Sequence, residues 1–240
     1  MNIAEFTTTN MTKKDFNNAL SQFKQAHGIE KIIGFAGGAD LPTDGLLNKA
    51  MQPFQSTLDH VMTEEIEKTL VKLADYRVAI LTGGTNGGVP ALAARTAKKH
   101  GFATIGVTPY TGIKHSLRSD IIDYQIVVEP VCEPSCWGDE TPTFCKLIDA
   151  LVVYGGSAGT GVEVMHLLKI NEARLKAGLP MKFIIPIHGS GGTADLVPHM
   201  PTKLTVKAAC LPRTPITNGL AAAEFLEEHL NLFDYTYFER

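Results

Sequence analysis

Short apolar runs that alternate with stretches of helical periodicity are the feature that most constrains the fold of this chain. Strands of a parallel sheet are buried on both faces and therefore read as continuous apolar runs. Their alternation with amphipathic helices is typical of an α/β sheet covered on both sides. The expected strands cover 31–36, 77–82, 103–109, 121–129, 149–154 and 182–187, and the expected helices cover 62–75, 89–100, 160–178 and 221–230.

Nothing along the chain divides it into separate units. With 240 residues, 44% of them hydrophobic, the chain is long enough to bury one α/β core. We expect a single domain over 1–240, with a helical preface at 1–28 and a helix-containing extension at 205–240. The sequence shows no internal repeat and no low-complexity linker.

Composition excludes several classes of partner. A formal net charge of −3 provides no basic field for a nucleic acid, so a small-molecule partner is expected instead. The amino-terminal sequence lacks the pattern of a secretory signal, and no run has the roughly 20 apolar residues of a membrane span. These features predict a cytoplasmic protein with neither a membrane nor a nucleic-acid partner.

Four cysteines are too few for a disulfide scaffold in a chain of this length, so free thiols are expected. Cys132, Cys136 and Cys145 lie close together in the sequence, which leaves a metal site as an alternative to loop and helix thiols. Their spacing lacks a paired CxxC and no histidine interrupts it, so we expect no metal.

Glycine-rich segments follow four of the expected strands, at 34–40, 81–90, 153–163 and 188–196. The carboxyl ends of parallel strands share one edge of the sheet, where open α/β sheets bind ligands. A helix entered through glycine offers free backbone N–H groups to phosphate oxygens. The candidate ligand-binding residues are Gly37, Gly38, Gly83, Gly84, Asn86, Gly155, Gly156, Ser157, Gly159, Thr160, Gly161, His188, Gly189, Ser190 and Gly191.

These loops lack the two best-known phosphate motifs. None of them matches GxxxxGK[ST], which argues against an ATP-hydrolysing P-loop. The first expected strand is followed by Gly37 and Gly38 but by no GxGxxG, which argues against an ordinary NAD-binding site.

Glu163 has two interpretations. Thr160 and Glu163 have the T-x-x-E spacing of a capping box, in which the carboxylate accepts a hydrogen bond from the backbone at the helix start. Alternatively, the carboxylate contacts a ligand sugar or activates a water, which makes Glu163 the candidate catalytic residue if the protein is an enzyme. The residues alone leave both interpretations open.

Two connections add further candidates. Lys114, His115 and Arg118 form a small basic segment that is either a solvated loop or a lid over a diphosphate. Trp137 lies in an acidic connection away from any periodic face, so it is either a core residue or a wall on which a base stacks.

The glycine loops resemble the SLOG superfamily of Rossmann-like nucleotide-binding proteins. The matching segments are LTGGTNGGV with TIGVTP, and DALVVYGGSAGTGVE with FIIPI. The second segment is similar to the PGGxGTxxE loop of the lonely-guy phosphoribohydrolases, with Tyr154 at the proline and one extra residue. TGGTNGGV and HGSGGTADL are similar to loops in the SLOG (LSDAT) region of melastatin-type TRP channels. The resemblance covers about residues 31–200 and implies a Rossmann-like parallel sheet of about six to seven strands.

The two resemblances imply different functions. The channel region implies a binding domain for an ADP-ribose-like or other phosphorylated nucleoside, acting as sensor or sequestering protein. The lonely-guy enzymes imply hydrolysis of a nucleoside 5′-monophosphate at its N-glycosidic bond, with Glu163 as the catalytic carboxylate. Those hydrolases carry an Arg-Lys pair before the PGG strand, whereas this chain has Asp139 and Glu140 there. We therefore expect a nucleotide-binding protein, assembled as a homodimer, that requires no cofactor beyond its nucleotide ligand.

Overall fold

The computed structural model describes residues 6–7, 13–39, 48–130 and 132–232. Its strands form one parallel sheet in the order β1-β5-β4-β3-β2-β6-β7. The strands are β1 (Phe6–Thr7), β2 (Lys31–Gly37), β3 (Val78–Thr82), β4 (Ala103–Pro109), β5 (Tyr124–Val128), β6 (Ala150–Tyr154) and β7 (Phe183–Pro186). The expected Rossmann-like α/β fold is confirmed.

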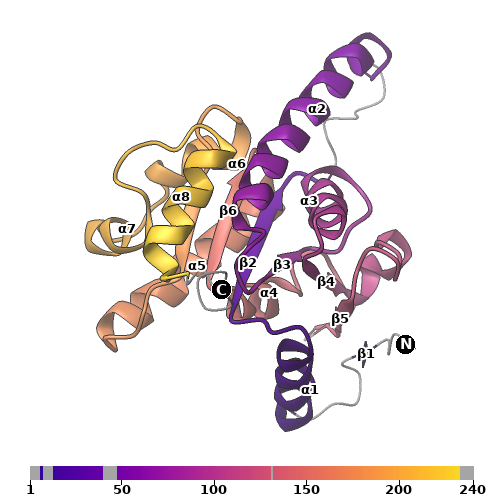
Figure 1. Ribbon diagram of the computed structural model, residues 1–240, viewed down its shortest axis with the longest axis vertical. Coiled ribbons are helices and arrows are strands. Elements are labelled where there is room, and N and C mark those ends of the chain that lie inside the picture. Colours follow the sequence, from indigo (N-terminus) through magenta and orange to yellow (C-terminus); the bar gives the residue numbers. More distant parts are fainter. Residues whose placement is uncertain (1–5, 8–12, 40–47, 131, 233–240) are drawn as a thin grey trace, which may run out of the picture.

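Helices cover both faces of this sheet (Figure 1). They are α1 (Lys13–Ala26), α2 (Asn48–Leu73), α3 (Gly88–Lys99), α4 (Thr141–Leu147), α5 (Ala158–Lys176), α6 (Gly192–Leu196), α7 (Leu204–Cys210) and α8 (Gly219–Leu230), with 3₁₀ turns η2 (Tyr110–His115) and η3 (Val197–His199). Within the described residues, no helix is both long and apolar enough to cross a membrane.

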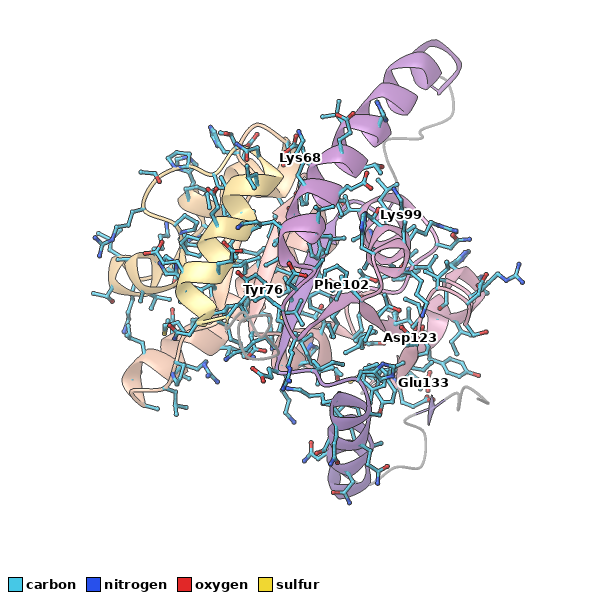
Figure 2. All side chains as sticks on the ribbon, viewed as in Figure 1. Lys68, Tyr76, Lys99, Phe102, Asp123 and Glu133 are labelled. Atoms are coloured by element: carbon cyan, nitrogen blue, oxygen red, sulfur yellow. The ribbon has the colours of Figure 1, made fainter. Side chains whose placement is uncertain are left out.

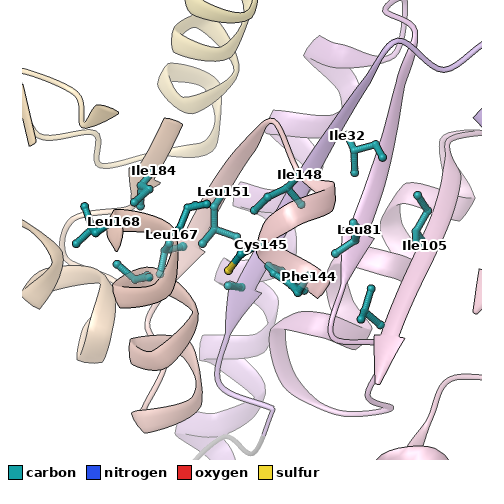
Figure 3. Packing of buried hydrophobic residues seen from close by; sticks show 14 of the residues in the cluster. Ile32, Leu81, Ile105, Phe144, Cys145, Ile148, Leu151, Leu167, Leu168 and Ile184 are labelled. Atoms are coloured by element: carbon teal, nitrogen blue, oxygen red, sulfur yellow. The ribbon is translucent and has the colours of Figure 1, made fainter. Parts of the chain in front are cut away.

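The side chains of β2, β3, β6 and β7 alternate between two cores. One core packs helices α1, α4 and α5 against residues such as Ile32, Leu81 and Leu151 (Figure 3). The other core lies on the opposite face, where Ile66 of α2 and Leu226 of α8 pack with strand residues. Both clusters contain side chains with almost no exposed surface, which explains why the strands are apolar at consecutive positions.

Charged side chains occupy the outward surfaces of the helices. Lys99 of α3 forms an ion pair with Glu67 of α2 at 2.6 Å (Figure 2). Tyr76, which follows α2, donates a hydrogen bond to Glu227 of α8 at 2.8 Å. These contacts join the helices on one face without reaching the glycine loops.

Several expected element bounds are wrong. The strand expected at 121–129 is shorter, since Asp123 precedes β5 and accepts a hydrogen bond from the Thr104 backbone N–H. The helix expected at 62–75 begins far earlier, at Asn48, and extends past the sheet at its amino-terminal end (Figure 1). Ile66 and Leu70, in the later half of α2, are fully buried, and the periodic apolar pattern around them predicted that part of the helix.

The connections of the sheet create one topological switch point. From β2, an interior strand, the chain proceeds through β3, β4 and β5 toward one edge, and then returns to β6 on the other side of β2. The helices that follow β2 and β6 therefore diverge, which leaves a crevice beyond the carboxyl ends of these strands.

Candidate functional site

A cavity of about 580 Å³ opens at this switch point. Its volume lies within the range of ordinary small-molecule sites. Segments that follow β2, β3, β4, β5 and β6 all contribute to it. The lining residues are Phe35, Ala36, Gly37, Gly38, Ala39, Gly83, Thr85, Asn86, Gly87, Pro90, Lys114, His115, Ser116, Trp137, Gly138, Glu140, Thr141, Ser157, Gly159, Thr160 and Glu163.

Helix α5 begins at this cavity. Its N-cap is Ser157, and no side chain supplies a cap hydrogen bond there. Ser157, Gly159 and Thr160 all line the cavity, so the first turn of α5 presents its backbone to the open space. The capping-box interpretation of Thr160 and Glu163 is wrong, because the helix begins before Thr160 and both residues lie inside it.

Helix α3 also begins at the cavity. Its N-cap is Gly87, again without a side-chain cap hydrogen bond. Gly83 and Asn86 of the preceding loop line the cavity. The loop is held by η2, since the Asn86 backbone N–H donates to the His115 carbonyl at 2.7 Å. The Asn86 side chain accepts a hydrogen bond from Arg95 at 2.8 Å, which fixes its orientation.

Glycine occurs at the cavity for different structural reasons at different positions. A Cβ atom at Gly37 would lie 2.5 Å from a methyl group of Val89, so packing alone requires glycine there. By contrast, a Cβ atom at Gly83 or Gly159 would meet no atom within 4 Å, and neither residue has a positive φ. Neither packing nor backbone conformation explains the absence of a side chain at Gly83 and Gly159.

Several candidate residues lie behind the cavity wall rather than on it. Gly84 has a φ of 66°, and a Cβ atom there would lie 3.0 Å from Thr108. Gly155 and Gly156 have φ values of 54° and 93°, and they turn the chain from β6 into α5. Gly161 lies in α5, where a Cβ atom would be 3.7 Å from Thr193. None of these residues lines the cavity.

The loop between β7 and α6 also lies outside the cavity lining, with all four of its candidates, His188, Gly189, Ser190 and Gly191. The Ser190 hydroxyl accepts a hydrogen bond from the Gly155 N–H at 2.8 Å, so this loop supports the turn before α5. The Asp195 carboxylate accepts hydrogen bonds from the N–H groups of Gly189 at 2.7 Å and Gly191 at 3.1 Å. The backbone donors expected to bind phosphate here are thus used by a carboxylate of the same chain.

Opposite charges line different parts of the cavity. Lys114 and His115 enter from η2, whereas Glu140 is the N-cap residue of α4 and Glu163 lies in α5. Burial, together with a smaller effect of the negative charge of Glu140, raises the pKa of Glu163 to about 8. Burial likewise raises the pKa of Glu140, although the Gly138 N–H donates to its carboxylate at 2.8 Å. Both carboxyl groups thus hold a proton more readily than ordinary glutamates.

For two segments that line the cavity, η2 and residues 137–141, the sequence left both a structural role and a ligand-binding role open. Lys114, His115 and Trp137 line the cavity, while Arg118 lies outside it and is paired with Asp120 at 3.9 Å. Their position after expected strands is the sequence feature that indicates a place at the cavity, because all strands of a parallel sheet end at the same edge.

The cysteines are free thiols that differ in burial. Cys132 and Cys136 are exposed, whereas Cys145 is buried in α4 and its thiol donates to the Glu163 carbonyl at 3.3 Å. In the described part of the chain, no three His, Cys, Asp or Glu side chains cluster in a way that could hold a metal ion.

Solved structures share this fold at low sequence identity. The structural-genomics target TM1055 superimposes with a TM-score of 0.56 at 16% identity, covering 83% of this chain and 99% of that one. The molybdenum cofactor carrier protein from Chlamydomonas reinhardtii superimposes with a TM-score of 0.52 at 21% identity, covering 84% of this chain and 99% of that one. A comparison with curated protein sequences gives no match.

The sequence match agrees with the fold. Residues 55–173 match the model of the SLOG cluster4 family. The matched segment includes the starts of α3 and α5 and ends before the loop between β7 and α6. By this match, which spans β3 to β6, the chain belongs to the SLOG superfamily.

Proposed function

We propose that this protein binds a phosphorylated small molecule of the nucleotide or ADP-ribose-like class and acts as a carrier or sensor for it. The observation that carries the proposal is the meeting of two helix starts, those of α3 and α5, at one cavity without a side-chain cap on either. Each start carries the positive end of a helix dipole and the backbone N–H groups of a first helical turn, and both attract phosphate. In α3 one of these groups, the Val89 N–H, already donates to the Gly38 carbonyl at 2.9 Å.

Two further observations support a phosphate ligand. Lys114 lines the same cavity and adds a positive charge. Gly83 and Gly159 keep the backbone accessible where packing would tolerate a side chain. A ligand that approaches the backbone closely supplies the missing reason for glycine at these positions.

The proposed carrier or sensor role is supported by the charged residues of the cavity and by the fold shared with a carrier protein. In the segment where the resemblance places the basic pair of the lonely-guy enzymes, this chain has Glu140, which lines the cavity, and Lys114 from η2 is the cation that could replace that pair. The Chlamydomonas protein with the same fold is described as a carrier of molybdenum cofactor. Assembly as a homodimer and a cytoplasmic location stay predictions, and light scattering after gel filtration measures the first.

A second candidate is hydrolysis of a nucleoside 5′-monophosphate at its glycosidic bond. It is favoured by one observation, namely that Glu163 lines the cavity with a pKa raised to about 8 by burial. Such a carboxyl group is protonated near neutral pH and can donate a proton to a leaving base. Release of free base by the wild type that disappears in Glu163→Gln would make the protein an enzyme.

The binding proposal is tested with a matched pair of glycine variants. Gly159→Ala and Gly161→Ala both add one methyl group within α5, and both should stabilise the helix by up to about 1 kcal/mol. Only Gly159 lines the cavity, so only its variant should weaken binding of AMP or ADP-ribose in calorimetry, and Gly159→Val should weaken it at least about tenfold.

The outcomes are separable. Equal affinity of Gly159→Val and wild type would place the phosphate site elsewhere. No binding of AMP, ADP-ribose or pyrophosphate to the wild type would overturn the proposed ligand class, and mass spectrometry of small molecules that co-purify with the native protein would then identify the ligand.

A further inference from the structure

Trp137 is a large aromatic side chain on the wall of the cavity. It lines the cavity, and 54% of its surface is exposed. It is the single tryptophan of the chain. The core interpretation of this residue is therefore wrong, because a core side chain of this size would be almost entirely buried.

The indole is supported from behind. A Cβ atom at Gly112, a buried residue of η2, would lie 3.0 Å from the Cη2 atom of Trp137 and 3.2 Å from its Cζ3 atom. Glycine thus lets the six-membered ring lie against the backbone of η2. The His115 ring lies nearby, with 6.4 Å between ring centroids and an interplanar angle of 33°.

The backbone around Trp137 is held by hydrogen bonds on both sides. The Asp139 carboxylate accepts from the Cys136 N–H at 2.9 Å and from the Ser135 hydroxyl at 3.2 Å. The Ser135 hydroxyl in turn accepts from the Thr111 N–H at 3.1 Å, which ties this turn to η2. The half-exposed indole therefore lies on an ordered support, which reduces the entropy lost when a ligand stacks on it.

We infer that Trp137 is the stacking surface for a planar heterocycle of the ligand, and hence that the ligand is a nucleotide with a base rather than a sugar phosphate alone. The inference rests on the proposed function, since it assumes that the phosphate binds at the starts of α3 and α5. Stacking on an aromatic side chain tolerates any base, because every base presents a π-face. Glu140 lines the same cavity and offers a carboxyl oxygen to N–H groups at the edge of the heterocycle.

The experiment uses the tryptophan fluorescence of the full chain, excited at a wavelength that its 6 tyrosines do not absorb, so that the signal reports on position 137 alone. AMP and GMP should quench this fluorescence, whereas ribose 5-phosphate should bind without quenching it. By calorimetry, the nucleotides should bind about tenfold or more tightly than ribose 5-phosphate.

Variants separate stacking from general damage. Trp137→Ala should weaken AMP binding about tenfold and leave ribose 5-phosphate binding unchanged, while Trp137→Phe should retain most of the affinity. Tyr110→Ala is the matched control, because Tyr110 is also 54% exposed on a neighbouring segment but does not line the cavity.

The results distinguish the two claims. If ribose 5-phosphate binds as tightly as AMP and GMP, and Trp137→Ala changes neither affinity, the stacking inference is wrong and the phosphate proposal stands. If no phosphorylated probe binds to the wild type, the proposed function fails and the inference falls with it.

Discussion

The loop between β6 and α5 and the loop between β7 and α6 have similar sequences and opposite properties. Both connect a buried strand to a helix through glycine and serine. The first leads into a helix of 19 residues whose start lines the cavity and lacks a side-chain cap. The second leads into a helix of 5 residues, and the Asp195 carboxylate of that helix accepts hydrogen bonds from the loop N–H groups of Gly189 and Gly191.

The difference shows what glycine content does and does not indicate. Glycine makes backbone donors accessible, but an internal carboxylate can use them before a ligand does. In HGSGGTADL the carboxylate is part of the same short segment, so the N–H groups of Gly189 and Gly191 already have a hydrogen-bond acceptor. In YGGSAGTGVE the carboxylate of Glu163 lies further along the helix, and no hydrogen bond to it is found among the described residues.

The largest expected effect concerns the turn before α5. Gly156 has a φ of 93°, and a Cβ atom there would lie 2.5 Å from the hydroxyl and 2.6 Å from the Cβ atom of the buried Thr160. Gly156→Ala should lower the free energy of unfolding by about 3 kcal/mol or more, measured by equilibrium denaturation in urea.

Gly189→Ala in the other loop is the matched comparison. Gly189 has a φ of 86°, but a Cβ atom there would meet nothing within 4 Å. Only backbone strain applies, so a loss of about 1–2 kcal/mol is expected. Equal losses at the two positions would show that backbone strain, and not the contact with Thr160, distinguishes them.

The second expected effect concerns Asp195. Asp195→Ala removes the acceptor for the Gly189 and Gly191 N–H groups and should cost about 2 kcal/mol of stability. Asp195→Asn keeps one acceptor oxygen and should cost less. Because this loop lies outside the cavity lining, calorimetry should find unchanged affinity for AMP in the folded variants. A selective loss of affinity in Asp195→Asn would return this loop to the ligand site.

The smallest expected effect is the pH dependence of stability from Glu163. Its pKa is about 8 in the folded protein and lies near 4.5 in an unfolded chain, so between these values the folded state binds more protons. The contribution of Glu163 to stability therefore falls as the pH rises from about 4.5 to about 8.

Glu163→Gln removes this titration. Relative to wild type, the variant should gain about 1 kcal/mol of stability between pH 5 and pH 8, a value reduced for solvent access to the cavity. Urea denaturation at several pH values measures it. Glu140→Gln is the control, since removing its charge should lower the pKa of Glu163 and flatten the wild-type profile in part. A pH-independent difference between Glu163→Gln and wild type would contradict the raised pKa.

The fold was largely predictable because burial on both faces leaves a local signal. β3, β4, β5, β6 and β7 lie within the expected apolar runs, and β2 extends one residue beyond its run. The strands β2, β3, β6 and β7 bury side chains in both cores. The first part of α2 was not predicted, because the periodic apolar pattern was recognised only from residue 62, around buried residues such as Ile66. Helix starts were predicted less well than strands, and Ser157 was missed as the N-cap of α5 because the T-x-x-E spacing indicated Thr160.

The sequence by itself determined the parallel α/β sheet and the presence of glycine loops at one of its edges, because periodicity and glycine content are properties of local segments. Only the tertiary structure decided which loops share the cavity, because that depends on strand order and on contacts between distant residues. Placing β6 beside β2 brings the start of α5 to the cavity, and the support from Gly112 holds Trp137 on its wall. The hydrogen bonds from Gly189 and Gly191 to Asp195 depend on the three-dimensional path of the loop, and the glycine pattern alone cannot show them.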